Sequence, residues 1–377
     1  MSSGLEFNLD RETFLARHWQ TKPLLVRQFI ENFKPPISSH QLAGLAMEDE
    51  VESRIIETAG STWNLHHGPF TNTDYKRDNP WTLLVQAVDH YIPEVAELRR
   101  LVDFIPQWRI DDVMVSYAVD GGSVGPHYDN YDVFLLQGEG ERLWKVGQFC
   151  DEQSPLLHHE DLRILSLFEC EQEYLLGPGD MLYIPPGVAH WGIAQGECTT
   201  FSIGFRAPRV NDLVSRFVDS LLEQVDSDQF YSDSRLEPVS RAGEIRPRDL
   251  ERVQAQVQAA LDQASGDHWF GELVTEPRCE LMPDDDDLAE ARAELRDGCN
   301  MVGLVPAARL AWQQDSGGLV VYANGESRQF SADLQALISE LCGCWKLEGE
   351  TLCAALADSK SSALLDHLLE TGCIYVE

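Results

Sequence analysis

The region from residue 108 to residue 207 constrains the fold most, because short apolar runs alternate there with clusters of glycine and proline. Glycine and proline pairs or triplets stand between the runs, among them Gly121-Gly122 and Gly177-Pro178-Gly179. Many short strands with such punctuation indicate a β-sandwich or a β-barrel. The predicted strands are residues 113–119, 133–137, 142–146, 181–184 and 200–205.

Two histidines and one aspartate lie within this strand-rich region in a pattern typical of a metal site. His127 and Asp129 are two residues apart, so on a strand both side chains project from one face while Tyr128 points away. His190 follows the rigid turn at residues 185–187, which can aim its ring toward the same ion. Two imidazoles and a carboxylate form the facial triad of a mononuclear iron(II) oxygenase, with open positions for a co-substrate and dioxygen. Zinc accepts the same donors and is the alternative metal.

Arg142 favours iron over zinc. It alternates with Trp144 and Val146, so its guanidinium should face the core, where it needs a carboxylate partner. A guanidinium fork matches a carboxylate in two hydrogen bonds, and 2-oxoglutarate chelating iron would extend its far carboxylate toward such a group. Ser116 is predicted to donate to the same carboxylate, and Thr200 is a weaker candidate. The alternative for Arg142 is a structural ion pair.

The flanking regions are predicted to be mainly helical. Before the strands we expect helices at residues 11–19, 41–47 and 81–88 and a short strand at 22–27. After them, two amphipathic helices near residues 211–222 and 247–261 leave apolar stripes that need cover, and we assign them to pairing of two subunits. Helices and hairpin signals after residue 273 resemble a winged helix. The predicted domains are therefore 1–208 (catalytic), 209–272 (helical, dimerisation) and 273–377 (winged-helix-like).

The net charge of −34, from 29 Lys and Arg against 63 Asp and Glu, indicates either simple solubility or a cationic macromolecular substrate. Residues 280–377 hold six basic against 18 acidic residues, which argues against direct DNA binding by the winged-helix-like part. No run approaches the roughly 20 apolar residues of a membrane span. The first residues lack the basic and apolar regions of a signal peptide, and nine scattered cysteines fit reduced thiols, so we expect a cytoplasmic protein.

The motifs described so far resemble the JmjC branch of the cupin oxygenases, and within it the bacterial ribosomal oxygenases. The similarity is dense over residues 10–208 and looser afterwards. The segments that carry it are WRIDD (108–112), GPHYDNYDVF (125–134), GERLW (140–144), GPGDMLYIPPGVAH (177–190) and GFRAP (204–208).

The resemblance implies a mixed α+β protein with a double-stranded β-helix core, a helical dimerisation segment and a C-terminal winged helix. It implies that His127, Asp129 and His190 bind Fe(II), that Arg142 and Ser116 bind 2-oxoglutarate, and that dioxygen is consumed. It further implies a basic substrate, an arginine hydroxylated at C3 in the sixteenth protein of the large ribosomal subunit. The second cupin motif usually has a polar residue four positions after its histidine, but this chain has Ala194 there and departs from the family pattern, which puts the contact expected at that point in doubt.

The residues that bind the substrate arginine are predicted only from their nearness to the ligands: Asp120, Tyr131 and Asp132. Three alternatives to arginine hydroxylation remain. The same site could hydroxylate histidine or remove N-methyl groups from another basic protein, or the chain could be a non-catalytic cupin that binds ribosomes. A winged-helix transcription factor is disfavoured by the local charge.

Overall fold

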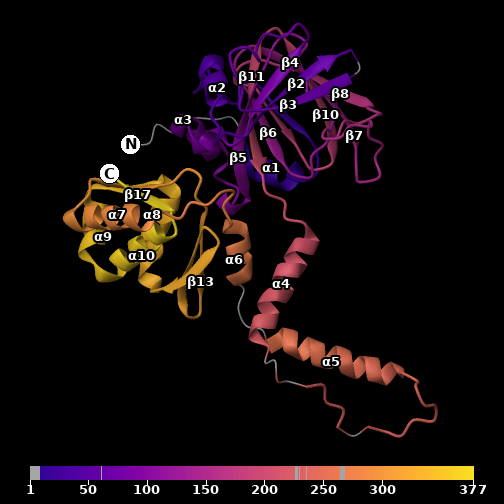
Figure 1. Ribbon diagram of the computed structural model, residues 1–377, viewed down its shortest axis with the longest axis vertical. Coiled ribbons are helices and arrows are strands. Elements are labelled where there is room, and N and C mark those ends of the chain that lie inside the picture. Colours follow the sequence, from indigo (N-terminus) through magenta and orange to yellow (C-terminus); the bar gives the residue numbers. More distant parts are fainter. Residues whose placement is uncertain (1–8, 61, 226–227, 229, 235, 264–267) are drawn as a thin grey trace. The chain divides into compact units, whose positions relative to one another are not determined.

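The computed structural model describes residues 9–60, 62–225, 228, 230–234, 236–263 and 268–377. Contacts divide the chain into two compact units. One comprises Met1–Ala207 with Val305–Ala307, and the other comprises Pro208–Leu304 with Ala308–Glu377 (Figure 1). Each unit is described by itself. Within the described residues, no helix has both the length and the apolar character that crossing a membrane requires.

The first unit is built on two antiparallel sheets. The large sheet has the strand order β1-β9-β6-β11-β5-β4-β2-β3, and the small one has the order β10-β7-β8. Neighbours in the sheets are mostly distant in sequence, as in a β-sandwich with crossing connections. The large sheet consists of β1 (Leu24–Val26), β2 (Ser53–Ala59), β3 (Thr62–His67), β4 (Trp81–Val85), β5 (Ile110–Ala118), β6 (Val133–Gln137), β9 (Met181–Ile184) and β11 (Cys198–Phe205). The small sheet consists of β7 (Glu141–Phe149), β8 (Cys170–Leu176) and β10 (Val188–Gln195).

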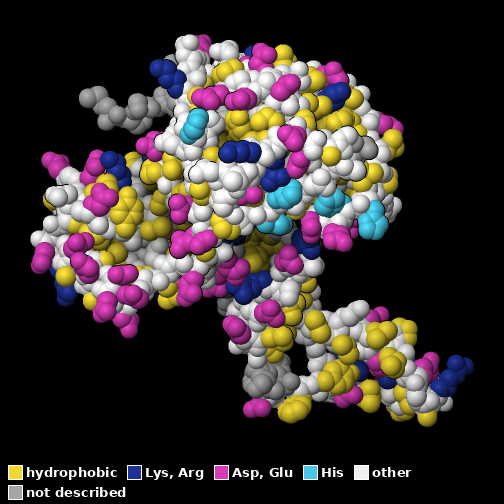
Figure 2. Space-filling view, turned by 45° about the horizontal axis from the view of Figure 1, so that its top comes forward, with side chains coloured by type: hydrophobic (Ala, Val, Ile, Leu, Met, Phe, Trp, Pro, Cys, Tyr) yellow, Lys and Arg dark blue, Asp and Glu magenta, His cyan; other side chains and the backbone are white. Residues whose placement is uncertain are grey.

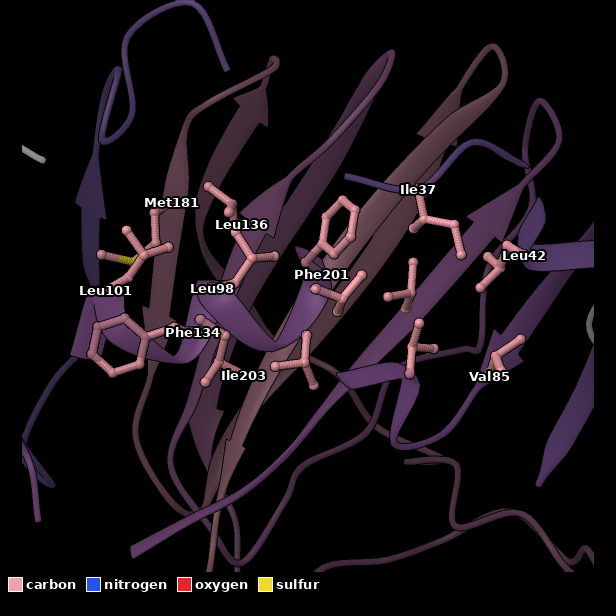
Figure 3. Packing of buried hydrophobic residues seen from close by; sticks show 14 of the residues in the cluster. Ile37, Leu42, Val85, Leu98, Leu101, Phe134, Leu136, Met181, Phe201 and Ile203 are labelled. Carbon is pink, nitrogen blue, oxygen red and sulfur yellow. The ribbon is translucent and has the colours of Figure 1, made fainter. Parts of the chain in front are cut away.

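The two faces of the large sheet have different partners. Alternate residues such as Phe134, Leu136 and Phe201 pack outward with residues of the flanking helices, for example Leu98 and Leu101 (Figure 3). The intervening residues, such as Leu135 and Leu182, pack with Trp144 and Val146 of the small sheet. Because side chains alternate along a strand, the same parity places Ser116, Ala118, Cys198 and Thr200 on the inner face.

Short helices cover the outer face of the large sheet: α1 (Arg11–Arg17), α2 (Ser39–Leu45), η1 (Val88–His90), α3 (Pro93–Ala96), η2 (Glu97–Val102) and η3 (Gln107–Arg109). The helix predicted at residues 41–47 is present as α2 but begins two residues earlier, where Ser38 and Gln41 form a reciprocal capping box. The helix predicted at residues 81–88 is wrong. This segment begins with strand β4, whose five residues are all buried between β2 and β5, and burial on both faces removes the alternation that identifies a strand.

The second unit combines helices with two three-stranded sheets, β16-β12-β17 and β13-β14-β15. The hairpin signals after residue 273 correspond to the turns at Gly317-Gly318 and Asn324-Gly325, which join β13 to β14 and β14 to β15. The helices are α4 (Val210–Gln224), α5 (Pro247–Gln263), α6 (His268–Thr275), α7 (Asp285–Asp297), η4 (Ala332–Leu334), α8 (Gln335–Cys344), α9 (Gly349–Ala357) and α10 (Ser359–Glu370). The strands are β12 (Met301–Leu304), β13 (Leu310–Asp315), β14 (Gly318–Ala323), β15 (Glu326–Phe330), β16 (Lys346–Glu348) and β17 (Ile374–Val376). All nine cysteines of the chain are free thiols.

Candidate metal and co-substrate site

The segment that carries His127 and Asp129 lies against the start of β10. It is extended but pairs at a single residue, where the backbones of His127 and His190 exchange hydrogen bonds of 3.1 and 2.8 Å. The amide of Gly187 donates to the carbonyl of Asp129 at 2.8 Å. Opposite His190, β7 contains one extra residue between Val146 and Phe149, since Val188 pairs with Phe149 and His190 with Val146. Such a bulge is common beside active sites, where it redirects a side chain.

These backbone contacts bring the three predicted ligands together. Asp129 Oδ2 lies 4.0 Å from His127 Nε2 and 3.6 Å from His190 Nε2, and the three ligand atoms lie within 4.8 Å of one another. His190 is buried, while His127 and Asp129 are about a quarter exposed, at 24% and 23%. The group can therefore bind one ion from one side and leave the partly exposed side open for other ligands.

Both imidazoles have the tautomer that metal binding requires. Nδ1 of His127 lies 3.0 Å from the carbonyl of Gly125, and Nδ1 of His190 lies 3.0 Å from the carbonyl of Val188. A carbonyl oxygen only accepts, so each Nδ1 carries the hydrogen and each Nε2 has a free lone pair. Burial, and then the nearby His127 ring, lower the pKa of His190 to about 4, so its ring is neutral at neutral pH. The donor set fits a divalent cation.

The structure places Arg142 on the inner face of β7 and buries it, with 4% of its surface exposed. Its Nε donates to Cys198 Sγ at 3.4 Å, and its Nη2 has no hydrogen-bond partner. No carboxylate of the described residues forms an ion pair with it. The alternative of a structural ion pair is therefore wrong for this part of the chain, and the guanidinium fits the carboxylate of a ligand.

Ser116 and Thr200 lie on the inner face of the large sheet, near the point where Cys198 contacts Arg142. They are register partners, two residues along β5 and β11 from the pair formed by Ala118 and Cys198. The Ser116 hydroxyl is 3.5 Å from the Thr200 carbonyl, which is a weak hydrogen bond, and Thr200 Oγ1 donates to Gln137 Oε1 at 3.2 Å. The Ser116 hydroxyl is therefore available to a ligand, while Thr200 already has a partner.

Comparison with known proteins identifies the family. A model of the JmjC domain matches residues 97–213, and a model of the ROXA-like winged helix matches residues 254–375. A model of the AraC-like ligand binding domain matches residues 167–276. The chain is 36% identical to the ribosomal protein uL16 3-hydroxylase of Escherichia coli, over 99% of both chains. The chain belongs to the JmjC-domain ribosomal oxygenases.

Other relatives of this ribosomal oxygenase agree. A probable ribosomal oxygenase of Haemophilus influenzae is 34% identical over 84% of this chain and 81% of its own length. The structure of YcfD, a ribosomal oxygenase of Escherichia coli, in complex with cobalt and 2-oxoglutarate matches with a TM-score of 0.83 at 35% identity, over 99% of both chains. The predicted family, fold class, enzyme class (a 2-oxoglutarate-dependent dioxygenase) and cofactors, Fe(II), 2-oxoglutarate and dioxygen, are confirmed.

Tyr131 and Asp120, two of the residues predicted to contact the substrate, differ in their partners. Tyr131 is 42% exposed, and the charge of the nearby Asp129, together with burial and the charge of Asp112, raises the pKa of its phenol. Asp120 is exposed and accepts the amide of Gly196 at 2.8 Å. Tyr131 is thus the predicted contact that the structure places beside a metal ligand.

The prediction for Asp132 as a substrate contact is wrong. Its side chain is fully buried and accepts hydrogen bonds from the Tyr183 hydroxyl at 2.5 Å, from Gln20 Nε2 at 3.0 Å and from Arg109 Nη2 at 3.3 Å. Those donors occupy the carboxylate and leave no exposed face for a guanidinium. Asp132 instead stabilises the fold next to the ligand segment, a role that its sequence position alone does not distinguish from substrate binding.

Sequence reasoning missed the support of the ligand segment by the connection between β7 and β8. Tyr128, which points away from the metal as predicted, donates its hydroxyl to the carbonyl of Asp151 at 2.7 Å and accepts from Arg163 at 3.2 Å. The amide of Leu165 donates to the carbonyl of Pro126 at 2.8 Å. These contacts hold the segment between the two ligands. The tyrosine between the ligands was the visible signal, but its partners could not be read from the sequence.

Proposed function

We propose that this oxygenase hydroxylates C3 of an arginine in the sixteenth protein of the large ribosomal subunit. One observation carries the chemistry: three metal-binding side chains lie together in the same sandwich as a buried guanidinium, which has no carboxylate partner in the described part of the chain. The full-length similarity to the uL16 3-hydroxylase of Escherichia coli supports the substrate. A ribosomal protein as substrate agrees with a cytoplasmic location.

In this proposal, one set of side chains binds the metal and another binds the co-substrate. His127, Asp129 and His190 bind the iron through Nε2, Oδ2 and Nε2. The bound iron and 2-oxoglutarate together supply the activation of dioxygen. Arg142 binds the distal carboxylate of the co-substrate, with Ser116 as a second donor, and this anchor fixes the orientation of the keto acid.

On the substrate side, Tyr131 combines an exposed side chain with a position near the metal ligand Asp129. An aromatic face attracts a guanidinium, so the ring of Tyr131 can pack against the aliphatic part and the guanidinium of a substrate arginine. Contact with Tyr131, next to a metal ligand, would bring the substrate chain close to the reacting centre. Asp120 stays a weaker candidate because its carboxylate already accepts a backbone amide.

The proposal is tested with purified protein, Fe(II), ascorbate, 2-oxoglutarate and a panel of basic ribosomal peptides. Succinate formation and peptide mass are followed together. Addition of one oxygen to an arginine of the uL16 peptide, coupled to succinate, supports the proposal. Oxygen on a histidine, or loss of a methylene from a methylated side chain, would replace it with one of the alternative oxidations.

A non-catalytic ribosome-binding role makes a different prediction. His127→Ala would then leave ribosome binding and any cellular phenotype intact, whereas a hydroxylase loses its product and its phenotype with this variant. Direct DNA binding is not expected, because the excess of acidic residues in 280–377 repels phosphates.

Activity on a basic substrate should depend on salt. Acidic side chains are spread over the visible face of the molecule (Figure 2), and a field of one sign accelerates encounter with an oppositely charged partner. We expect kcat/KM for the uL16 peptide to fall about tenfold between low and high ionic strength, because salt screens exposed charges. A peptide with its other basic residues replaced by glutamine, measured in parallel, should show little salt dependence. Equal salt dependence of both peptides would contradict steering.

We also propose that α4 and α5 pair two copies of the chain. On α4, apolar side chains spaced four residues apart form one exposed face: Val210 (74%), Val214 (55%), Val218 (39%) and Leu222 (64%). On α5, Leu250, Val253 and Val257 are about half exposed. Figure 2 shows hydrophobic side chains gathered over these helices. Apolar stripes of this length are normally covered by a partner.

Disrupting the α4 stripe should therefore separate the subunits. We expect Val214→Glu combined with Leu222→Glu to convert a dimer into a monomer in sedimentation, because each buried charge costs more than the apolar contact it replaces. Gln224→Glu, an exposed position on the same helix, is the matched control and should remain dimeric. A wild-type chain that sediments as a monomer at micromolar concentration would refute the pairing.

A further inference from the structure

The inner face of β7 carries a second buried donor without a partner. Besides Nη2 of Arg142, the indole Nε1 of Trp144 has no hydrogen-bond partner among the residues that the structure describes, and Trp144 is only 4% exposed. Buried polar groups in folded proteins are nearly always hydrogen-bonded, so each exception needs an explanation. An indole N–H can only donate, so its missing partner is an acceptor.

Trp144 lies between the metal ligands and the guanidinium. The centroid of its ring is 5.9 Å from that of His190, and the guanidinium carbon of Arg142 is 5.8 Å from the ring. In the pairing of β7 with β10, His190 faces Val146, Gly192 faces Trp144 and Ala194 faces Arg142. A co-substrate that bridges the metal and Arg142 must therefore pass Trp144.

The indole is oriented with its N–H away from β10. A Cβ on Gly192 would lie 2.9 Å from Cη2 and Cζ3 of Trp144, so the glycine is needed for the benzene edge of the indole to pack there. Nε1 belongs to the other edge of the indole, and the buried side chains that cluster with Trp144, such as Leu135, Leu176 and Leu182, are apolar. Those side chains offer no acceptor, which leaves a ligand as the natural source of one.

We propose that Trp144 Nε1–H is a further donor to the distal carboxylate of 2-oxoglutarate, shared with Arg142. The proposal rests on the assignment of Arg142 as the co-substrate anchor. A carboxylate has about four acceptor positions on two oxygens, so a single group can accept from the guanidinium and from the indole. This assignment explains both unpartnered donors with one ligand.

The test compares two keto acids that chelate a metal alike. Zn(II), which accepts the same donors, is loaded into the protein, and 2-oxoglutarate and 2-oxobutyrate, which lacks the distal carboxylate, are titrated calorimetrically. Trp144→Phe keeps an aromatic ring and removes the N–H. We expect its Kd for 2-oxoglutarate to rise about tenfold, the effect of one lost hydrogen bond to a charged group, and its Kd for 2-oxobutyrate to stay unchanged.

Two further variants separate the possible outcomes. Trp191→Phe is the matched control, because its Nε1 already donates to Ser123 Oγ at 2.7 Å, and it should leave the ratio of the two affinities unchanged. Arg142→Met tests the anchor itself. If Arg142→Met binds 2-oxoglutarate normally, the proposed co-substrate site fails. If Arg142→Met loses 2-oxoglutarate but Trp144→Phe does not, only the role of Trp144 is overturned.

A second measurement does not depend on how well Trp144→Phe folds. With ¹⁵N-labelled tryptophan, the nine indole groups of the Zn(II)-loaded protein give separate NMR signals. One indole proton, still present in Trp191→Phe, should shift downfield when 2-oxoglutarate binds and should not do so with 2-oxobutyrate. Indole signals that respond equally to both acids, or to neither, would overturn the proposal.

Discussion

Replacing Asp129 with alanine is expected to abolish hydroxylation of the uL16 peptide. Asp129 Oδ2 is the one anionic donor of the three and lies within 4.0 Å of both Nε2 atoms, so its loss leaves two neutral imidazoles for a dication. Loss of an outer-shell partner alone costs about 10- to 100-fold in metal affinity or activity, so the loss of a ligand should exceed about 100-fold in kcat/KM. The measurements are Fe(II) affinity by anaerobic titration and hydroxylation by mass spectrometry.

Asp103→Ala is the matched control for this variant. Asp103 is half exposed and pairs with Arg11 at the surface, where an ion pair contributes little to stability. It should keep full iron affinity and activity. An Asp129→Ala protein that folds and still hydroxylates the peptide at more than a tenth of the normal rate would remove Asp129 from the ligand set.

Replacing Arg142 with methionine should weaken 2-oxoglutarate binding and, unlike most core substitutions, stabilise the ligand-free protein. Losing one partner of a buried, hydrogen-bonded charge pair costs about 2–5 kcal/mol, so the Kd for 2-oxoglutarate should rise by at least about 30-fold. Without co-substrate, Arg142 is a buried cation that has no carboxylate partner among the described residues. Exchanging it for an apolar side chain of similar length should raise the free energy of unfolding by about 1 kcal/mol.

Arg109→Met is the control, and it should change the free energy of unfolding in the opposite direction. The guanidinium of Arg109 lies 3.3 Å from the fully buried carboxylate of Asp132, so its removal leaves a buried charge without its ionic partner. We expect this variant to lose about 3 kcal/mol of stability in urea unfolding. Equal destabilisation by both substitutions would show that Arg142 has a structural partner and is not reserved for a ligand.

The metal ligands and the guanidinium were predictable because each depends on strand parity or on a short motif. His127, Asp129 and His190 follow from donor type and spacing, although the first two lie on an extended segment with a single backbone bridge and not on a full strand. The position of Arg142 follows from its alternation with Trp144 and Val146, since a strand presents every second residue to one face.

The parts that sequence reasoning missed depend on contacts between distant segments. Cys198 meets Arg142 because β11 and β7 face each other from different sheets, which no local pattern reveals. Asp132 follows Tyr131 in the same motif. Its side chain is nevertheless buried and bonds to Arg109 and Tyr183, whereas Tyr131 is exposed. In β4 both faces are buried, so the sequence lacks the alternation of polar and apolar residues that identifies a strand. The pattern therefore favoured a helix.

A crystal structure of the chain with Co(II) and 2-oxoglutarate tests the central claim most directly, with the metal located by its anomalous signal. We predict one ion bound by His127 Nε2, Asp129 Oδ2 and His190 Nε2, with the keto acid chelating it and the distal carboxylate on Arg142. A metal bound elsewhere, or a co-substrate whose distal carboxylate turns away from Arg142, would contradict it.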